Sequence, residues 1–582
     1  MIIRDRIKKD IGEAFSKLTI NDQRLTIDDS DIEVTRTADA KFGDFSTNIA
    51  LKISRDDKRS PLEFARVLAD SLKALPYVEK LEVAGPGFIN FFIKAEIWQK
   101  QVSDVLTSQS LGVNNYGSNN LGKGKKARVE FVSANPTGPL HFGNARGGPI
   151  GDVLASVLQF SGYEVLREYF HNDIGGQVEK LGQSIMNVAN GAKLSQQEYK
   201  GDYILELAHK LASQGLALEP QKIGQKAVEL ILAEIEADCR KMGITFDKIY
   251  PESGFAKSGD TKRVLDSLEE KGVLKKSHGA VWFAPHLRSG QAPSDEFLKD
   301  RETVVKKSDG DYTYFANDIA YHNLKFSEGY DLVVDIFGAN HHGHVPRLQA
   351  AISALGFDPS RFHVILYQWV RFKRGLELVK MSKRSGTFIT AKEVLDEVGR
   401  DPLRFFILMH DPNSHIDFDL DLAKKKSADN PVYYVQYANA RIVSILAKLK
   451  VKSPAKGEAR RRRQKSKVDY SLLTTVYELD LIKQITRFPE LVEDIASSFA
   501  VHRLTAYAID LADSFHRFYE NCRVIPASTR AHSPASTNRG ESTRGGGEKE
   551  DLMQARLGLI LATKIALANT LKLLGISAPE KM

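Results

Sequence analysis

Strands and helices alternate through the middle of the chain, and this alternation constrains the fold more than any other feature. The apolar stretch ARVEFVSAN (127–135) leads into a helical pattern over about 144–161, and YEVLREYF (163–170) again has the character of a strand. GYDLVVDIFGAN (329–340) and RFHVILYQWV (361–370) return to apolar, β-branched residues. Strands separated by helices favour a parallel sheet with crossover helices, so we predict an α/β domain.

The chain has 582 residues, which is too long for one core, and its sequence pattern changes twice. Residues 1–110 predict a small α/β domain that includes two short strands in KLEVAGPGFINFFI (80–93). Residues 120–425 predict the larger α/β domain, with a polar, partly helical insertion at about 190–300. Residues 426–582 lack strand signals and show apolar residues at three- and four-residue spacing, which predicts an all-α bundle.

Two segments of the bundle region, 453–467 and 526–551, are poor in apolar residues and rich in Ser, Gly and charge. They bury too little apolar surface to offset ordering entropy, so we expect flexible loops between helices. The net charge of +8 permits a nucleic-acid partner. However, Lys452–Lys467 carries eight bases against one acid, so the overall charge says little about the rest of the chain.

The cysteine content and the lack of targeting signals indicate a compartment. Two cysteines, Cys239 and Cys522, cannot form a disulfide framework or a zinc site by themselves, which is typical of a reducing environment. No uninterrupted apolar run reaches transmembrane length, and the N-terminal residues mix acids with bases, unlike a signal or transit peptide. We therefore expect a cytoplasmic protein with no membrane partner and no structural metal.

The first candidate motif, SANPTGPLHFGNARGG (133–148), lies where a strand gives way to a helix. There the helix presents unpaired N–H groups and the positive end of its dipole, which together bind phosphate. His141 and Asn144 can both donate to one anion, and Gly143 leaves room for a nucleotide. A strand-to-helix turn with a polar cap would give the same pattern, so this motif alone leaves both interpretations open.

The second candidate motif, ELVKMSKRSGTFIT (377–390), places three cations around a serine. Such a segment favours phosphate, and Lys383 would act as a point charge on a triphosphate. A solvated basic turn is the ordinary alternative. The two motifs together favour a nucleotide site made by His141, Gly143, Asn144, Lys380, Met381, Ser382, Lys383 and Arg384.

The paired motifs resemble the HIGH and KMSKS signatures of class I aminoacyl-tRNA synthetases, and the chain resembles the arginyl-tRNA synthetases over nearly its whole length. The resemblance implies a Rossmann-like class I catalytic domain with an insertion, an additional tRNA-binding N-terminal domain and an α-helical anticodon-binding domain. It is carried, in family order, by VEFVSANPTGPLHFGNARGGPIGD (129–152), EYFHNDIGGQVEKLG (168–182), DYTYFANDIAYH (311–322), GANHHGHVPRLQAA (338–351), DEVGRDPLRFFIL (396–408) and NPVYYVQYANARI (430–442).

The resemblance implies an arginine–tRNA ligase, whose substrates are ATP with Mg²⁺, L-arginine and tRNA(Arg), and which acts as a monomer. It assigns ATP to the two motifs above. It assigns the arginine substrate to Glu130, Ser133, Asn135, Tyr314 and Asp318. Weaker candidates for the same pocket are Asn172, Asp173, Gln177, His341 and His342. For tRNA, the aromatic-rich helices offer Tyr433, Tyr434, Tyr437 and Phe518, and the resemblance points weakly to Tyr519 and Asn521.

Three positions depart from the family pattern. Asn144 and Asn439 stand where histidine is usual, and Asn340 replaces a usual aspartate. Asparagine keeps an N–H donor but cannot carry positive charge. A catalytically idle relative that only binds tRNA is therefore one alternative, although the intact Lys380–Arg384 segment argues against it. A synthetase for another amino acid is a second alternative, and the acidic residues assigned to the pocket argue against that.

Overall fold

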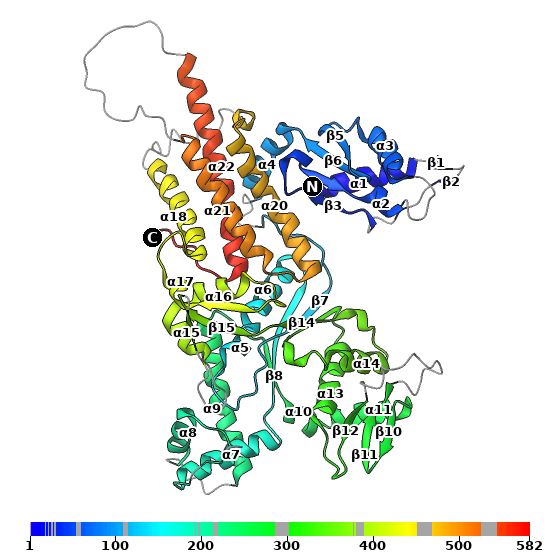
Figure 1. Ribbon diagram of the computed structural model, residues 1–582, viewed down its shortest axis with the longest axis vertical. Helices are drawn as coiled ribbons and strands as arrows, with labels where there is room; N and C mark the ends of the chain where they lie inside the picture. Colours follow the sequence, from blue (N-terminus) through cyan, green and yellow to red (C-terminus); the bar gives the residue numbers. More distant parts are fainter. Residues whose placement is uncertain are drawn as a thin grey trace, which may run out of the picture.

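The computed structural model describes most of the chain and divides into three regions (Figure 1). The described residues are 2–17, 19–20, 23–24, 27, 31–53, 60–108, 115–192, 194–195, 198–212, 219–285, 302–375, 377–379, 389–450, 468–524 and 544–582.

The N-terminal region is a four-stranded antiparallel sheet, in the order β3-β4-β6-β5, covered by helices. Helix α3 begins where the Ser60 side chain accepts from the Glu63 N–H, and Pro61 occupies its first turn. Its buried face packs on α1, where the Phe15 and Phe64 rings lie 5.6 Å apart. The elements are α1 (Ile3–Lys17), β1 (Thr19–Ile20), β2 (Gln23–Arg24), β3 (Val34–Arg36), η2 (Ala40–Phe42), β4 (Phe45–Thr47), α2 (Ile49–Ile53), α3 (Pro61–Leu72), β5 (Val78–Ala84) and β6 (Phe88–Ile93).

The central region is a five-stranded sheet in which every strand is parallel to its neighbours, as predicted. Its order is β14-β13-β7-β8-β9, so the direction of winding reverses between β7 and β13. Ligands of open α/β sheets bind in the crevice at the carboxyl ends of the strands beside such a reversal. The strands are β7 (Lys126–Glu130), β8 (Glu164–His171), β9 (Lys248–Pro251), β13 (Leu332–Gly338) and β14 (Phe362–Tyr367).

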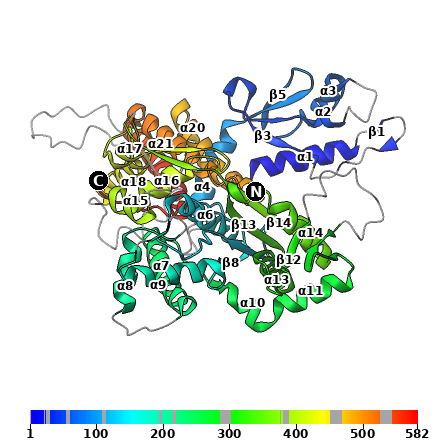
Figure 2. The ribbon, with the colours of Figure 1, turned by 60° about the horizontal axis from the view of Figure 1, so that its bottom comes forward.

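Helices cover both faces of this sheet. Figure 2 shows α6 on one side of β13 and β14 and α13 with α14 on the other. The glycines of α6 allow close packing, since a Cβ on Gly151 would lie 2.2 Å from the Phe131 ring. These helices are α5 (Phe142–Ala145), α6 (Gly147–Phe160), α13 (Tyr314–Ser327) and α14 (Val345–Leu355), with the short turns η4 (Ala339–His341) and η5 (Pro359–Arg361).

The expected insertion at 190–300 is not one continuous insertion, because β9 returns to the sheet and pairs with β8. This strand has only four residues and ends in a proline at the sheet edge, so its sequence signal is weak. A helical unit precedes β9, made of α7 (Gly176–Ala189), α8 (Asp202–Ala212) and α9 (Pro220–Lys241). After β9 come α10 (Glu252–Ser258), α11 (Asp260–Glu270) and an antiparallel sheet of β10 (Leu274–Ser277), β11 (Ala280–Phe283) and β12 (Thr303–Lys306).

A small sheet links the parallel sheet to the C-terminal bundle. In it β15 pairs in parallel with β17 and antiparallel with β16. Helix α15 begins at a capping box, in which Thr390 and Glu393 bond each other's backbone N–H groups. The elements are β15 (Val370–Arg374), β16 (Glu377–Leu378), α15 (Ala391–Val398), α16 (Arg400–Leu408), β17 (Ile416–Asp419) and α17 (Leu420–Lys424).

The C-terminal region is a helical bundle, as predicted. Gly575 directly follows α22 with a φ of 67°, as expected for a C-terminal cap. Helix α4 (Ala95–Thr107) joins this bundle by packing on α20 and α22. The other elements are α18 (Pro431–Lys450), η7 (Tyr470–Leu472), α20 (Val476–Ser498), α21 (Arg503–Asn521) and α22 (Arg544–Leu574).

The structure corrects one of the two loop predictions. Residues 453–467 and 525–543 lie outside the described residues, but 544–551 form the first turns of α22 rather than a loop. A polar, glycine-rich turn extends a helix when the packing of later turns anchors it. Helix α22 is long and apolar enough to cross a membrane by length and composition alone. Because 72% of its apolar stretch is buried, packing inside the bundle accounts for that composition.

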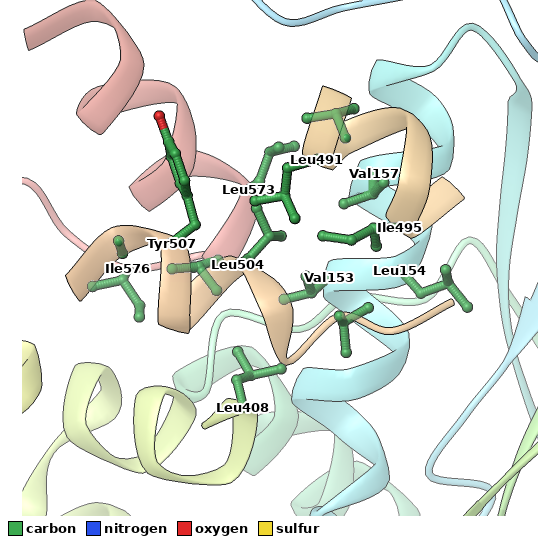
Figure 3. Close-up of a cluster of buried hydrophobic side chains, with 14 of the residues drawn as sticks. Val153, Leu154, Val157, Leu408, Leu491, Ile495, Leu504, Tyr507, Leu573 and Ile576 are labelled. Atoms are coloured by element: carbon green, nitrogen blue, oxygen red, sulfur yellow. The ribbon is translucent and has the colours of Figure 1, made fainter. Parts of the chain in front are cut away.

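Helix α6 of the parallel-sheet region also belongs to the core of the bundle (Figure 3). Its buried side chains lie in one cluster with residues from four other helices (α16, α20, α21 and α22) and from the chain end. The cluster consists of Val153, Leu154, Val157, Leu408, Leu491, Ile495, Leu504, Tyr507, Leu573 and Ile576. The two regions therefore share one continuous apolar core.

Candidate active site

The two sequence motifs meet at the start of α5. His141 forms an isolated bridge with Thr390, and the Ala391 N–H donates to the Leu140 carbonyl oxygen at 2.8 Å. The Phe142 N–H donates to the Ile389 carbonyl oxygen at 3.1 Å. The last residues of the second motif are thus bonded to the first motif. The predicted phosphate-binding residues of the second motif fall outside the described residues, namely Lys380, Met381, Ser382, Lys383 and Arg384.

His141 caps the first turn of α5. Its ring Nδ1 accepts from the Gly143 N–H at 2.8 Å. A Cβ on residue 143 would lie 2.8 Å from that same nitrogen, so glycine is required beneath the ring. Asn144 is exposed, and its carbonyl oxygen accepts from the Tyr367 hydroxyl at 3.4 Å. No described residue hydrogen bonds the Asn144 amide, which leaves its N–H₂ group available for a ligand.

Arg146 anchors the beginning of α6 from below. It is fully buried, and it donates to the carbonyl oxygens of Gln368 at 2.5 Å and Asp411 at 3.1 Å. Burial lowers the pKa of Arg146 to about 10. Because both acceptors follow other elements of the domain, Arg146 fixes the turn that begins at His141 to the rest of the fold.

The loop after β7 has an uncommon backbone conformation. Val132 and Ser133 have φ values of 69° and 37°, the left-handed region that residues other than glycine rarely adopt. The Ser133 hydroxyl accepts from the Phe170 N–H at 3.1 Å, and the Tyr169 hydroxyl donates to the Ala134 carbonyl oxygen at 2.5 Å. Strand β8 therefore holds this loop in its strained form.

Three of the predicted pocket residues lie within hydrogen-bonding distance of one another, as expected for residues of one pocket: Asn135, Asn172 and Gln177. The Asn135 amide donates to Gln177 Oε1 at 3.3 Å, and its own oxygen accepts from the Asn172 N–H at 3.4 Å. Asp173 faces another partner, because it accepts from the N–H and the hydroxyl of Ser253 at 2.8 and 2.5 Å. Asp173 thereby fixes the start of α10 beside the pocket.

Tyr314 and Asp318 share one face of α13, as their spacing predicted, and both contact His344. Asp318 Oδ2 lies 2.9 Å from His344 Nε2, and the Tyr314 ring centroid lies 5.9 Å from that of His344. The His341 ring is 6.5 Å from His344. His342 is exposed, and its Nδ1 lies 3.2 Å from the Ala339 carbonyl oxygen. Of the two histidines we predicted, His341 therefore joins this cluster.

Glu130 is a buried acid, not an exposed one at the end of its strand. Its side chain is only 3% exposed, and its Oε2 accepts from Lys325 Nζ at 2.6 Å. Burial, opposed by Lys325, raises the pKa of Glu130 to about 7. The sequence analysis did not identify Lys325, since nothing in a helical stretch shows which lysine turns inward.

Glu252 is a further buried acid near this site, and unlike Glu130 it was not predicted from the sequence. It is 5% exposed and accepts from the Asn317 amide at 2.7 Å. Burial raises the pKa of Glu252 to about 7, and the charges of Asp318 and Asp173 add to the rise. Glu252, Asp173 and Asp318 thus concentrate negative charge at one end of α13, which favours a cationic ligand.

Three family models match successive parts of the chain. The arginyl tRNA synthetase N terminal domain matches 3–93, the class I (R) tRNA synthetase catalytic domain matches 101–203 and 219–414, and the DALR anticodon binding domain matches 435–582. The chain belongs to the arginyl-tRNA synthetase family.

Relatives named arginine–tRNA ligase match this synthetase over nearly its full length. The one from Citrifermentans bemidjiense is 40% identical and covers 95% of each chain. The one from Caldanaerobacter subterraneus is 39% identical and covers 100% of this chain and 98% of its own. The Thermus thermophilus arginyl-tRNA synthetase structure has a TM-score of 0.74 over both whole chains at 22% identity, which shows the same fold.

The anticodon-binding domain of this synthetase carries an exposed aromatic surface. The Arg441 guanidinium lies 5.0 Å from the Tyr437 ring and 4.8 Å from the Tyr519 ring, and Tyr433 stacks on Tyr437. The candidates differ in exposure. Phe518 is fully buried, while Tyr433 and Tyr434 are half-buried and Tyr437 and Tyr519 are more than a third exposed. The exposed rings could stack on unpaired bases.

Two departures of this synthetase from its family have structural settings. Asn439 is buried, and its amide donates to the Pro579 carbonyl oxygen at 2.9 Å, which ties α18 to the chain end. Asn340 is exposed in the turn η4 beside the His341 cluster.

Asn521, the other predicted tRNA contact, is bonded within its own helix, because its amide donates to the Arg517 carbonyl oxygen at 2.8 Å.

Proposed function

We propose that this synthetase activates L-arginine with ATP and transfers it to the 3′ end of tRNA(Arg), with the residues named below. One observation carries the proposal: the backbone of the His141 turn is bonded to residues 389–391, directly after the cationic segment. That connection supports a single nucleotide site made from two motifs far apart in the sequence. The reversal of strand order beside β7 supports an amino-acid site next to it.

The first step joins arginine to AMP. An oxygen of the arginine carboxylate attacks the α-phosphorus of ATP, and the bond to the bridging oxygen breaks to release pyrophosphate. Negative charge grows on phosphate oxygens, so the protein acts by positioning and by electrostatic stabilisation. His141 and Asn144 would donate to the phosphates at the start of α5, and the Gly143 backbone would approach them closely.

Lys380 and Lys383 would hold the β- and γ-phosphates and stabilise the departing pyrophosphate. Mg²⁺ would arrive with ATP and neutralise charge on the phosphates. Over the described ranges, no group of three or more His, Cys, Asp and Glu side chains could hold a metal. The nucleotide itself would therefore supply most of the ligands of that ion.

The arginine site would lie at the acidic end of α13. Asp318 and Tyr314 would bind the guanidinium, with Glu130 beneath them, because a planar fork of donors matches carboxylates. Ser133 and Asn135 would hold the amino-acid end, and the hydrogen bonds that fix their loop support such a role. Asn172, Gln177 and His341 would line the same pocket.

In the second step a hydroxyl of the terminal tRNA ribose attacks the carbonyl carbon of the adenylate, and AMP leaves. The aromatic surface of Tyr437 and Tyr519 with Arg441 would bind unpaired anticodon bases. Asn521 is the weaker candidate, because its amide is already bonded. The family further supports a monomer that acts in the cytoplasm, and the two free cysteines are compatible with that compartment.

ATP–pyrophosphate exchange with L-arginine tests this proposal. It should be run with and without tRNA(Arg), because the family is expected to need tRNA for activation. Exchange that depends on arginine supports the proposal, and lysine or glutamine in its place should give none. A folded protein that binds tRNA without exchange in either condition would be a catalytically idle relative.

A further inference from the structure

Three carboxylates lie side by side across the middle of the parallel sheet. Asp335 of β13, Glu130 of β7 and Glu168 of β8 are register partners on neighbouring strands, so their side chains leave the same face of the sheet. Each is at most 3% exposed. Buried carboxylates so close together repel one another, and this row therefore requires cations between its members.

Lys325 of α13 is the one described side chain that contacts all three. Its Nζ lies 2.6 Å from Glu130, 2.7 Å from Asp335 and 3.3 Å from Glu168. Burial alone would lower the pKa of Lys325, but the three carboxylates outweigh it and raise that pKa above its ordinary value. Lys325 is therefore charged, and its three N–H donors face the three acids.

The two outer carboxylates each have a second partner. Glu168 accepts from Arg128 Nε at 2.8 Å, and Asp335 lies 2.9 Å from His322 Nε2. Glu130, the central one, has Lys325 alone among the residues that the structure describes. The Glu130 oxygen that Lys325 does not bind can accept a further hydrogen bond, so Glu130 retains capacity for one more partner.

Glu130 lies beside the proposed substrate site, so the substrate is the candidate for this further partner. Glu130 is the last residue of β7, immediately before the strained loop that leads to His141. On α13, Lys325 lies two turns after Asp318, and His322 connects them, since its Nδ1 lies 2.7 Å from the Asp318 carbonyl oxygen. One buried network thus joins the strand end to the helix of the acidic pocket.

We propose that Lys325 is a positioning residue for the amino-acid substrate: it fixes the Glu130 carboxylate at the end of β7 and favours its ionised form, so that the second oxygen accepts the substrate guanidinium. This inference rests on the proposed function. A buried ionised carboxylate that lacks a partner penalises an uncharged ligand of the same shape, so Lys325 also contributes to the selection of arginine over its neutral isostere citrulline.

The variant Lys325→Met tests the proposal, because it keeps an apolar chain of similar length and removes the charge. The KM for arginine in aminoacylation should rise about 10- to 100-fold, while the KM values for ATP and tRNA change by less than about two-fold. Citrulline should compete with arginine more effectively in Lys325→Met than in the wild type. The matched control is Lys271→Met, whose Nζ donates only to the Leu355 carbonyl oxygen at 2.6 Å.

A pH profile separates positioning from a merely structural role. The charged groups around Glu130 are Arg128 on β7, Glu168 on β8, Asp335 on β13, and His322 and Lys325 on α13. Without Lys325, Glu130 should take up a proton more readily. The KM for arginine of Lys325→Met should therefore fall between about pH 7 and about pH 9, more steeply than that of the wild type.

Three outcomes would overturn the proposal. The first is a folded Lys325→Met protein whose KM for arginine is unchanged, and the second is an equal rise for arginine and ATP. If Lys325→Met does not fold, the single variant Glu130→Gln is compared with the double variant Glu130→Gln/Lys325→Met, which loses one acid and one base. The KM for arginine of the two variants should agree within about two-fold if Lys325 acts through Glu130. The third contrary outcome is a further rise in the KM for arginine when Lys325→Met is added to Glu130→Gln.

The proposed function can fail separately from this inference. Calorimetric titration of the wild-type protein with L-arginine and ATP in the presence of tRNA gives that readout. If the wild type neither binds nor activates arginine, the proposed function is refuted. If it does so while Lys325→Met behaves like Lys271→Met, only the role of Lys325 is refuted.

Discussion

The backbone N–H of Phe142 donates to the carbonyl oxygen of Ile389, so the first turn of α5 is bonded to the chain that directly follows the cationic motif. The neighbouring bond between Ala391 and Leu140 makes this a short two-sided connection. Backbone bonds do not depend on side-chain identity. The two halves of the proposed nucleotide site are therefore held together by bonds that do not depend on the side chain at position 144.

Asn144 can be tested by two substitutions. Asn144→Ala removes the exposed side-chain amide in the first turn of α5 and should lower kcat/KM for ATP about 100-fold, a typical cost for one donor to a developing anion. Asn144→His restores the family residue and should stay within about tenfold of the wild type, because it keeps a donor at similar reach. Asn190→Ala, an exposed asparagine at the end of α7, is the control. A harmless Asn144→Ala would remove Asn144 from the ATP site.

Asp318 should distinguish the two small substrates. Asp318→Ala removes a carboxylate from the acidic end of α13 and should raise the KM for arginine about 30-fold, equivalent to a charged hydrogen bond of about 2 kcal/mol. The KM for ATP should barely change. The exposed pair of Asp266 with Lys262 on α11 supplies a control, Asp266→Ala. Equal effects of Asp318→Ala on both KM values would refute its assigned role.

Glu252 should make stability depend on pH. Its folded pKa of about 7 exceeds the ordinary value of 4.5, so the folded state keeps a proton that the unfolded state has lost. Stability should therefore fall as the pH rises from 4.5 to 7. Glu252→Gln should reduce this fall, to which Glu130 also contributes, and gain up to about 3 kcal/mol above neutral pH, measured by denaturant unfolding at both ends of that range. The exposed Glu269→Gln should keep the wild-type profile, and an equal fall in Glu252→Gln would contradict the assignment.

The N-terminal region is attached to the bundle by ion pairs. Arg36 forms a two-pronged contact with Glu490, at 2.7 and 3.0 Å, and Glu490 is 4% exposed. Arg36→Ala strands that buried carboxylate and should lower the free energy of unfolding by about 3 kcal/mol. Fluorescence during urea unfolding gives the readout, since Arg36 lies 5.3 Å from the Trp98 ring. Lys9→Ala, which breaks an exposed pair with Glu13, should cause no measurable change.

The sequence was sufficient to predict the parallel sheet and the bundle, because both depend on local periodicity. Strands such as β13 are apolar and β-branched throughout, and α21 repeats apolar residues at helical spacing. Strand β9 was missed because four residues at a sheet edge give almost no period. The start of α22 was predicted wrongly for the opposite reason, since three glycines beside charged residues suggest a loop until tertiary packing is known.

The residues of the candidate site also fall into those that the sequence predicts and those that only the structure identifies. Tyr314 and Asp318 could be paired from their spacing alone, and the start of α5 from its turn chemistry. Lys325, His344 and Glu252 could not, because each acquires its environment from a residue on another element. A lone sequence carries no signal for such long-range pairing. Only the register of β13, β7 and β8 makes the carboxylate row visible.

Helix α6 has a consequence for any attempt to recombine this synthetase with another. One of its faces packs on strands of the parallel sheet, and the other lies in the bundle core with Leu491, Ile495 and Leu573 (Figure 3). A chimera that joins this catalytic domain to a foreign anticodon-binding domain would inherit a mismatched half-core. Such chimeras should aggregate unless the α6 residues that face the bundle are exchanged together with it. The boundary for exchanging the two domains therefore lies within α6 and not at the linker.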